Sequence, residues 1–296
     1  MEDQRISKRD EPAGGGRLAA GLWLAATPIG AAGDVTLRTL DALARADAIA
    51  AEDTRTALKL MTLHGVARGG RPMIAYHDHN GEAARPGILA RIAAGESVVY
   101  VSEAGTPLIA DPGFKLAAEA AARGLPVFAL PGASALLAAL AVAGLPTDRF
   151  LFAGFPPPKQ AARRAMLAEL ATVPATLVFY ESPRRLAASL ADMVSVLGGA
   201  RGAAVCRELT KKFEETRRGT LADLAAEYAG TEPRGEIVVV VGPPGPAETS
   251  EAALDDALRA ALREMGVRDA AASVSAALGL PRRRVYARAL ELAGAS

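Results

Sequence analysis

From residue 22 onward, short apolar runs alternate with segments in which apolar residues recur at helical spacing. The apolar runs lie at 22–26, 48–51, 73–76, 97–101 and 126–130. The helical segments lie at 37–45, from 54, at 83–93, after 113 and at 134–142. This alternation is typical of strand–helix–strand units, so it predicts a mostly parallel sheet with helices on both faces.

A second α/β region is predicted after residues 144–149, where the pattern resumes. Its apolar runs lie at 150–153, 176–180, 203–207 and 237–241, with shorter helices between them. The sequence therefore predicts two α/β domains, at 21–146 and 147–242, after a flexible tail at 1–20. The segment 242–247 is rich in Gly and Pro, as linkers are.

Beyond this linker the apolar runs stop, and helices at 251–264 and 269–278 are predicted. Gly279 makes a turn, and Pro281 starts a third helix that carries Arg282, Arg283 and Arg284. A short helix, a Gly-containing turn and a basic helix resemble a helix-turn-helix module, here at 250–296. The alternative is a small helical cap with a solvated basic face.

Composition narrows the class of protein. Half of the 296 residues are hydrophobic and 23% are charged, which is typical of a globular chain. The formal net charge is only +1, so contact with nucleic acid would need a local basic patch. The single cysteine, Cys206, excludes an internal disulfide and fits a reducing cytoplasm. The longest uncharged stretch, 124–147, is broken by Pro and Gly, so no membrane span is expected.

Three loops that follow predicted strands of the first domain have the residues of a ligand site. They lie at 27–34, 102–113 and 130–135, and they combine Gly and Pro with an acid or a Ser. Because ligands of open α/β sheets bind beyond the carboxyl ends of the strands, we expect the three loops to share one pocket, and Ser134 to cap the next helix. Taken singly, each could be an ordinary connection.

Several other sites are not supported. Neither a dinucleotide fingerprint nor a phosphate-binding P-loop is present, and Leu136 stands where a hydrolase nucleophile turn needs its second glycine. His77 and His79 point the same way on an extended segment, but no third ligand stands at a recognisable spacing. We therefore predict no metal site.

Charged clusters follow two predicted strands of the second domain, at 180–185 and 206–215, and Lys159 follows another. Charged side chains at the ends of the strands can contact a polyanion or transfer a proton. The alternative is a salt-bridged surface loop.

Taken together, these segments resemble the ribosomal RNA small subunit methyltransferase I family, within the tetrapyrrole methylase superfamily. The matching strings are ATPIG (26–30), AEDTR (51–55), YHDHN (76–80), AGTPLIADPG (104–113), LPGASAL (130–136), GFPPPK (154–159), FYESPRR (179–185), RELTKKFEE (207–215) and RGE (234–236). Three positions depart from the usual pattern: Ala31-Ala32 replaces Asn-Leu, Glu103 replaces Asp and Arg184 replaces His.

The resemblance implies a tetrapyrrole methylase-like fold with the cofactor between two α/β domains, and a homodimer. It implies methyl transfer from S-adenosylmethionine to the ribose 2'-hydroxyl of a decoding-region cytidine in small-subunit ribosomal RNA, free or in the assembled subunit. The cofactor-binding residues that it implies are Pro28, Ile29, Gly30, Glu103, Ala104, Gly105, Thr106, Pro107, Leu108, Ile109, Ser134, Ala135, Tyr180, Leu209 and Ile237.

Two further sets of residues are candidates by position. Catalytic candidates, none of them singled out as the general base, are Glu181, Arg207, Glu208 and Lys211. RNA-binding candidates are Lys159, Arg184, Arg185, Lys211, Lys212, Arg282, Arg283 and Arg284. Two other functions stay open: a small-molecule tetrapyrrole methylase, which would need neither the basic helix nor the RELTKK string, and a non-catalytic nucleic-acid binder led by the terminal module.

Overall fold

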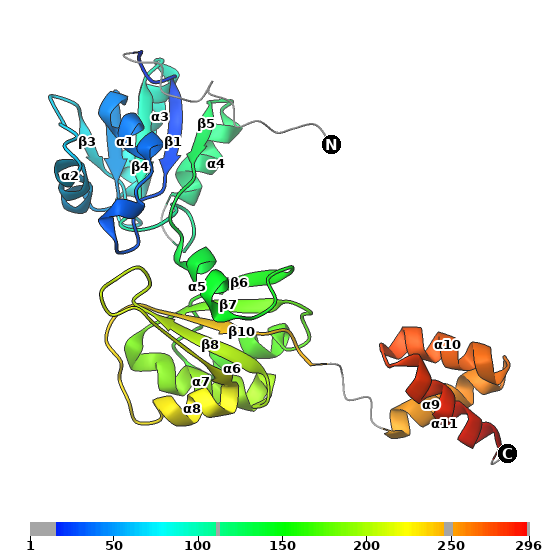
Figure 1. Ribbon diagram of the computed structural model, residues 1–296. Helices are drawn as coiled ribbons and strands as arrows, with labels where there is room; N and C mark the ends of the chain where they lie inside the picture. Colours follow the sequence, from blue (N-terminus) through cyan, green and yellow to red (C-terminus); the bar gives the residue numbers. More distant parts are fainter. Residues whose placement is uncertain (1–15, 111–112, 246–250, 295–296) are drawn as a thin grey trace.

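The computed structural model describes residues 16–110, 113–245 and 251–294. Most of the expected tail and part of the expected linker therefore lie outside the described residues. The described chain forms two α/β domains and a helical module (Figure 1). The predicted fold class is confirmed. No helix in the described ranges has the length and apolar character that crossing a membrane requires.

The first sheet has the order β3-β2-β4-β1-β5, and every strand pair in it is parallel. Its strands are β1 (Gly21–Ala25), β2 (Ala48–Ala51), β3 (Met73–Ala75), β4 (Ser97–Val101) and β5 (Val127–Leu130). The predicted parallel sheet is confirmed. All five strands therefore end at the same edge, and the loops that follow them meet there.

Helices cover both faces of this sheet. On one face lie α1 (Leu37–Arg45) and α2 (Thr54–Leu63), and on the other α3 (Gly81–Ala93) and α4 (Phe114–Ala122). Side chains start two of them: Thr36 accepts a hydrogen bond from the Thr39 backbone N, and Asp53 accepts from those of Arg55 and Thr56. A 3-10 turn, η2 (Ala32–Asp34), precedes α1.

The second sheet has the order β6-β7-β10-β8-β9. Its strands are β6 (Phe150–Gly154), β7 (Thr176–Glu181), β8 (Gly202–Arg207), β9 (Glu215–Thr220) and β10 (Ile237–Val241). Only β6 and β7 pair in parallel; β10 runs antiparallel to both of its neighbours. Strand β9 was not predicted, because its sequence, ETRRGT, has no apolar run; it is an edge strand with exposed arginines.

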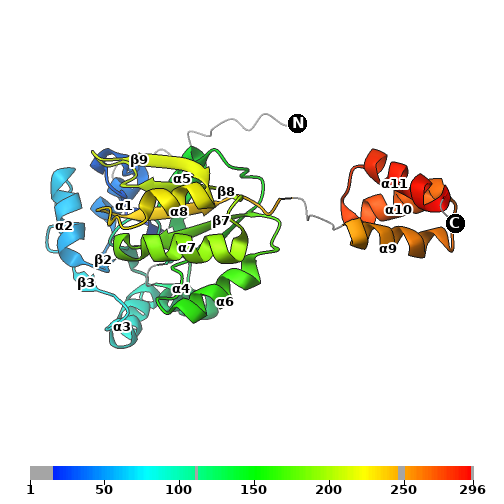
Figure 2. The same ribbon diagram turned by 90° about the horizontal axis from the view of Figure 1, so that it is seen from below.

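Four helices cover the second sheet. On one face α6 (Gln160–Leu170), α7 (Leu186–Leu197) and α8 (Leu221–Tyr228) lie side by side, as Figure 2 shows. On the other face lies α5 (Ala135–Ala143), which packs on β8 and β10. Because α5 packs on the second sheet, it belongs by its contacts to the second domain, although it precedes the expected boundary at 144–149. Ser134 occupies the N-cap position of α5, but its side chain makes no capping hydrogen bond, contrary to expectation.

The C-terminal module contains α9 (Glu251–Leu262), α10 (Val267–Leu278) and α11 (Arg282–Gly294). These helices have an apolar core of their own around Leu258 and Val285. Gly279 ends α10 with a φ of 63°, a conformation that favours glycine. The predicted three-helix arrangement is confirmed, with shifted boundaries.

Candidate functional site

Three loops of the first domain are tied together at the carboxyl edge of its sheet. The backbone N–H groups of Thr27 and Gly105 each donate to the other's carbonyl, at 2.9 and 3.0 Å. The Thr106 hydroxyl donates to the Ala133 carbonyl at 3.0 Å. The loops after β1, β4 and β5 therefore form one surface.

This surface faces the second domain across a cavity of about 370 Å³. The first domain contributes Ile29, Ala104, Gly105, Thr106, Ile109 and Ala110, and the start of α5 contributes Ser134 and Ala135. The second domain contributes Phe155, Tyr180, Glu181, Ser182, Pro183, Leu209, Gly235, Glu236, Ile237 and Val238. The walls are mainly apolar, with a few polar groups, as in small-molecule sites.

Ten of the fifteen expected cofactor residues line this cavity. They are Ile29, Ala104, Gly105, Thr106, Ile109, Ser134, Ala135, Tyr180, Leu209 and Ile237. Pro28, Gly30 and Glu103 instead line a second, smaller cavity on the first domain. Pro107 and Leu108 line neither of these two cavities.

Sequence reasoning missed the part of the wall that precedes β10. The predicted site was built from loops after strands, whereas Gly235 and Glu236 come before a strand. Because β10 is antiparallel to β7 and β8, its first residue lies beside their last ones: Ile237 pairs with Glu181 and with Arg207. The RGE string at 234–236 was the available signal. Phe155, whose ring lies 5.5 Å from that of Tyr180, was missed as well.

Strained backbone borders the cavity. Among the described residues other than glycine, positive φ angles occur at Leu108 (73°), Ala110 (60°), Glu208 (52°) and Thr210 (64°). All four lie in the two loops that follow β4 and β8. Such conformations cost free energy and are concentrated at binding and catalytic sites.

Glu181 is buried at the end of β7, with 3% of its surface exposed. Its carboxylate accepts hydrogen bonds from the Ser182 backbone N and the Ser189 hydroxyl, and it forms an ion pair with Arg185 at 2.7 Å. These bonds hold the segment 181–189 in place. The arrangement therefore favours a positioning role for Glu181 over proton transfer.

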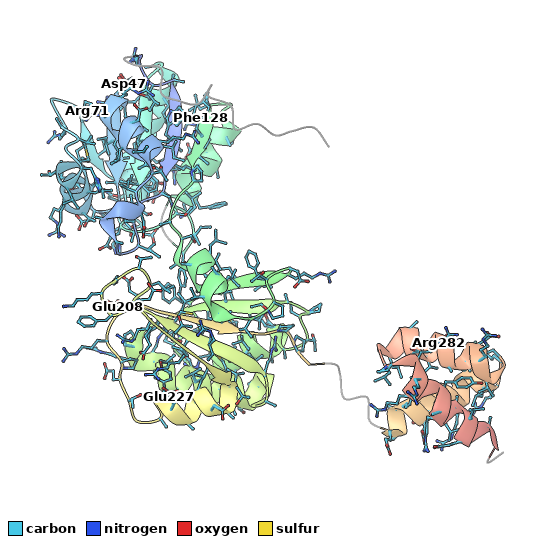
Figure 3. The ribbon with its side chains drawn as sticks, viewed as in Figure 1. Asp47, Arg71, Phe128, Glu208, Glu227 and Arg282 are labelled. Carbon is cyan, nitrogen blue, oxygen red and sulfur yellow. The ribbon has the colours of Figure 1, made fainter. Side chains whose placement is uncertain are left out.

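The other three catalytic candidates all form ion pairs. Arg207 pairs with Glu215 at 3.3 Å, and Lys211 Nζ lies 2.9 Å from Glu208 and 3.0 Å from Glu236. The hydrogen bond from the Glu236 backbone N, followed by the Lys211 contact, lowers the pKa of Glu208 despite partial burial. Partial burial would lower the pKa of Lys211, but its bonds to Glu208 and Glu236 outweigh this and raise it. Lys211 is therefore a fixed cation, and Glu208 lies at the end of the second domain that faces the first (Figure 3).

The expected RNA-binding residues fall into two groups. On the α/β domains, Lys159 and Lys212 are exposed, whereas Arg184 pairs with Glu232 and Arg185 with Glu181. Arg282, Arg283 and Arg284 are exposed at the start of α11. Figure 3 labels Arg282. Arg185 and Lys211 thus form ion pairs with carboxylates of the protein itself.

The segment that contains His77 and His79 forms a turn before α3. The Asn80 side chain accepts a hydrogen bond from the His77 backbone N at 2.9 Å, and the two imidazole rings lie 6.0 Å apart. Within the described part of the chain, no group of three or more His, Cys, Asp or Glu side chains could hold a metal ion.

Two family models match the chain. The model of the tetrapyrrole (corrin/porphyrin) methylases matches residues 21–225, and that of the RsmI C-terminal HTH domain matches residues 248–293.

Curated relatives cover nearly the whole chain. The chain is 49% identical to ribosomal RNA small subunit methyltransferase I of Mesorhizobium japonicum, with 93% of each chain covered. It is 42% identical to the protein of that name from Pseudomonas aeruginosa, covering 94% of this chain and all of the relative.

Solved structures share the fold. The methyltransferase CobJ has a TM-score of 0.58 at 22% identity and covers 76% of this chain and 94% of its own. Uroporphyrin-III C-methyl transferase from Thermus thermophilus, complexed with S-adenyl homocysteine, has a TM-score of 0.51 at 22% identity. The match covers 77% of this chain and 97% of that structure's chain. The chain belongs to the tetrapyrrole methylase family and, within it, to the ribosomal RNA small subunit methyltransferase I family.

Proposed function

We propose that this protein transfers a methyl group from S-adenosylmethionine to the ribose 2'-hydroxyl of a decoding-region cytidine in small-subunit ribosomal RNA. The observation that carries the proposal is the apolar cavity of about 370 Å³ between the two α/β domains, in a chain 49% identical to a ribosomal RNA small subunit methyltransferase I. The relatives' name supports the RNA substrate. The proposal extends to a homodimer, to action in the cytoplasm and to the assembled small subunit as substrate.

The cavity fits S-adenosylmethionine in size and in the chemistry of its walls. Its volume lies in the usual range of cofactor sites. Ile29, Ile109 and Leu209 provide apolar surface. Gly105 has no side chain and a φ of 76°, so its backbone can lie directly against the cofactor. When bound there, S-adenosylmethionine supplies an electrophilic methyl group on a positively charged sulfur.

The remaining tasks fall to the protein's own side chains. The walls of both domains hold the reactants in a fixed geometry, which supplies much of the acceleration in a group transfer. The ribose hydroxyl must lose its proton, and two carboxylates line the cavity. Glu181 is occupied by hydrogen bonds, whereas the Glu236 side chain is 76% exposed. We therefore assign proton acceptance to the Glu236 carboxylate, with Lys211 beside it as a fixed cation.

The experiment that tests the function uses small ribosomal subunits from a strain that lacks this protein. Purified protein and S-adenosylmethionine with a labelled methyl group should label the RNA, and nuclease digestion should place the label on a cytidine ribose. Label on a base, or no label on subunits or free RNA, contradicts the proposal. Methylation of a uroporphyrinoid in the absence of RNA would favour the small-molecule alternative. Tight binding of S-adenosylhomocysteine to residues 1–245 would count against a purely nucleic-acid-binding role.

A further inference from the structure

A second cavity, of about 150 Å³, lies on the first domain at the carboxyl ends of β1 and β4. One side of it is α2 and the other is the loop that leads into η2. Apolar groups of Pro28, Ala32, Ala57 and Leu60 line it, and Thr27 and Glu103 supply polar ones.

The two cavities share their dividing wall. In the loop after β1, Ile29 lines the large cavity, while its neighbours Pro28 and Gly30 line the small one. In the loop after β4, the same change of side occurs between Glu103 and Ala104. The two loops are held together by the mutual backbone hydrogen bonds of Thr27 and Gly105. The two cavities are therefore neighbours, divided by the loops after β1 and β4.

The wall of the small cavity includes a residue with an unused hydrogen-bonding group. Thr27 is only 4% exposed, and no partner for its Oγ1 atom is found among the described residues. A buried hydroxyl without a partner costs free energy, so such groups are rare in folded proteins. A ligand atom that bonded to this hydroxyl would remove this cost.

Charges at the rim select the kind of ligand. Glu103 and Lys59 both line the cavity and are exposed. The Glu103 backbone N donates to Glu52 Oε2 at 3.1 Å, which anchors the residue at the rim. A carboxylate accepts hydrogen bonds, so it favours a base with an N–H donor on its edge. The Lys59 ammonium suits a phosphate.

Resting on the proposed function, we propose that the small cavity receives the base of the nucleotide that is methylated. A cavity of about 150 Å³ holds one six-membered aromatic ring. In a nucleotide the base is bonded to the ribose carbon next to the one that carries the 2'-hydroxyl. A base in the small cavity would thus present that hydroxyl toward the neighbouring donor cavity. RNA bases that are recognised individually are commonly unstacked and inserted into such pockets.

The test compares Ala32→Phe, which fills the small cavity, with Ala90→Phe, which adds the same ring on the exposed side of α3. Methyl transfer to unmethylated small subunits is measured, together with calorimetric binding of S-adenosylhomocysteine. We expect Ala32→Phe to lower kcat/KM for the subunits at least about 100-fold. Its S-adenosylhomocysteine affinity should stay within about twofold of wild type, and Ala90→Phe should match wild type in both.

A second variant, Thr27→Val, removes the unpartnered hydroxyl and keeps the side-chain shape. Loss of one hydrogen bond to the base should lower kcat/KM about tenfold. Because the hydroxyl has no partner among the described residues, the melting temperature should be unchanged or higher, which a structural role of Thr27 would not produce.

Three results would overturn the inference. The first is a wild-type kcat/KM for the subunits in Ala32→Phe. The second is a loss of S-adenosylhomocysteine affinity in Ala32→Phe that is as large as its loss of kcat/KM. The third is a lower melting temperature of Thr27→Val with an unchanged kcat/KM. If the wild-type protein itself fails to label the subunits, the proposed function fails, and that outcome is distinct because it appears before any variant is compared.

Discussion

The backbone of Gly30 lies directly against the side chain of Lys211, so that the first domain touches the second beside the donor cavity. A Cβ atom on Gly30 would stand 2.5 Å from Lys211 Cγ and 2.7 Å from Thr210 Oγ1. The adjacent Ala31 backbone N donates to the same Thr210 hydroxyl at 3.0 Å. The loop after β1 and the loop after β8 thus define one side of the cavity together.

Gly30→Ala should push these two loops apart. Because the added methyl group would overlap Lys211 and Thr210, we expect S-adenosylhomocysteine to bind about tenfold more weakly. Gly33→Ala is the matched control, since no atom lies within 4 Å of the position of its Cβ. Equal affinities of the two variants in calorimetry would show that this contact does not shape the cavity.

Gly105→Val should block the donor cavity. Gly105 lines it with a φ of 76°, and its Cβ would stand 3.2 Å from Ile29 Cγ2. We expect a loss of S-adenosylhomocysteine affinity of about 100-fold or more. Gly95→Val separates this effect from backbone strain, because Gly95 has a φ of 85° and open space around its Cβ position. An affinity that falls equally in both variants would assign the loss to strain.

Glu236→Gln should slow the chemical step. Because an amide cannot accept the ribose proton, we expect kcat to fall about 100-fold, with S-adenosylhomocysteine affinity within about twofold of wild type. Glu227→Gln, on α8 at a distance from Glu208 (Figure 3), is the control. A variant that retains wild-type kcat would remove Glu236 from the mechanism.

The Asp53 carboxylate, which caps α2, should make stability depend on pH in acid. Hydrogen bonds from Arg55 lower the pKa of Asp53 from 3.8 to about 2. A lowered pKa stabilises the folded state fully above pH 3.8, and this contribution is lost as the pH falls toward 2. Asp53→Asn keeps a capping side chain without the charge. The gap in urea midpoint between wild type and Asp53→Asn should therefore narrow as the pH is lowered from above 3.8 to about 2, and parallel curves would contradict the assignment.

Charge reversal of Arg282, Arg283 and Arg284 to Glu should weaken RNA binding by the C-terminal module. The slope of log affinity against log salt concentration should fall by about 0.7 to 0.9 for each phosphate that the variant no longer binds. S-adenosylhomocysteine affinity should not change, because these residues lie outside the donor cavity. Arg263→Glu with Arg268→Glu alters exposed charges elsewhere in the module. If the two sets of variants weaken binding equally, α11 has no special role.

Apolar patterning predicted most of the elements, because a buried strand must be apolar whatever lies beside it. The run Ile237–Val241 predicts β10, and the basic segment after Pro281 predicts α11. The same logic missed β9, which gains its stability from pairing with β8 at the sheet edge and not from burial. It also placed α5 before the boundary, since periodicity shows that a helix has an apolar face but not which sheet covers that face.

The sequence by itself determined that two α/β domains and a helical module would form, and which loops would follow the strands of the first sheet. Only the tertiary structure decided the side of each loop on which a residue lies, so that Ile29 borders the donor cavity and Gly30 the smaller one. It alone brought Glu236 beside Glu181 and Lys211, because the pairing direction of β10 is set by strand neighbours that are distant in the chain. Local propensity acts over a few residues, whereas a cavity is enclosed by segments that meet only after the chain has packed.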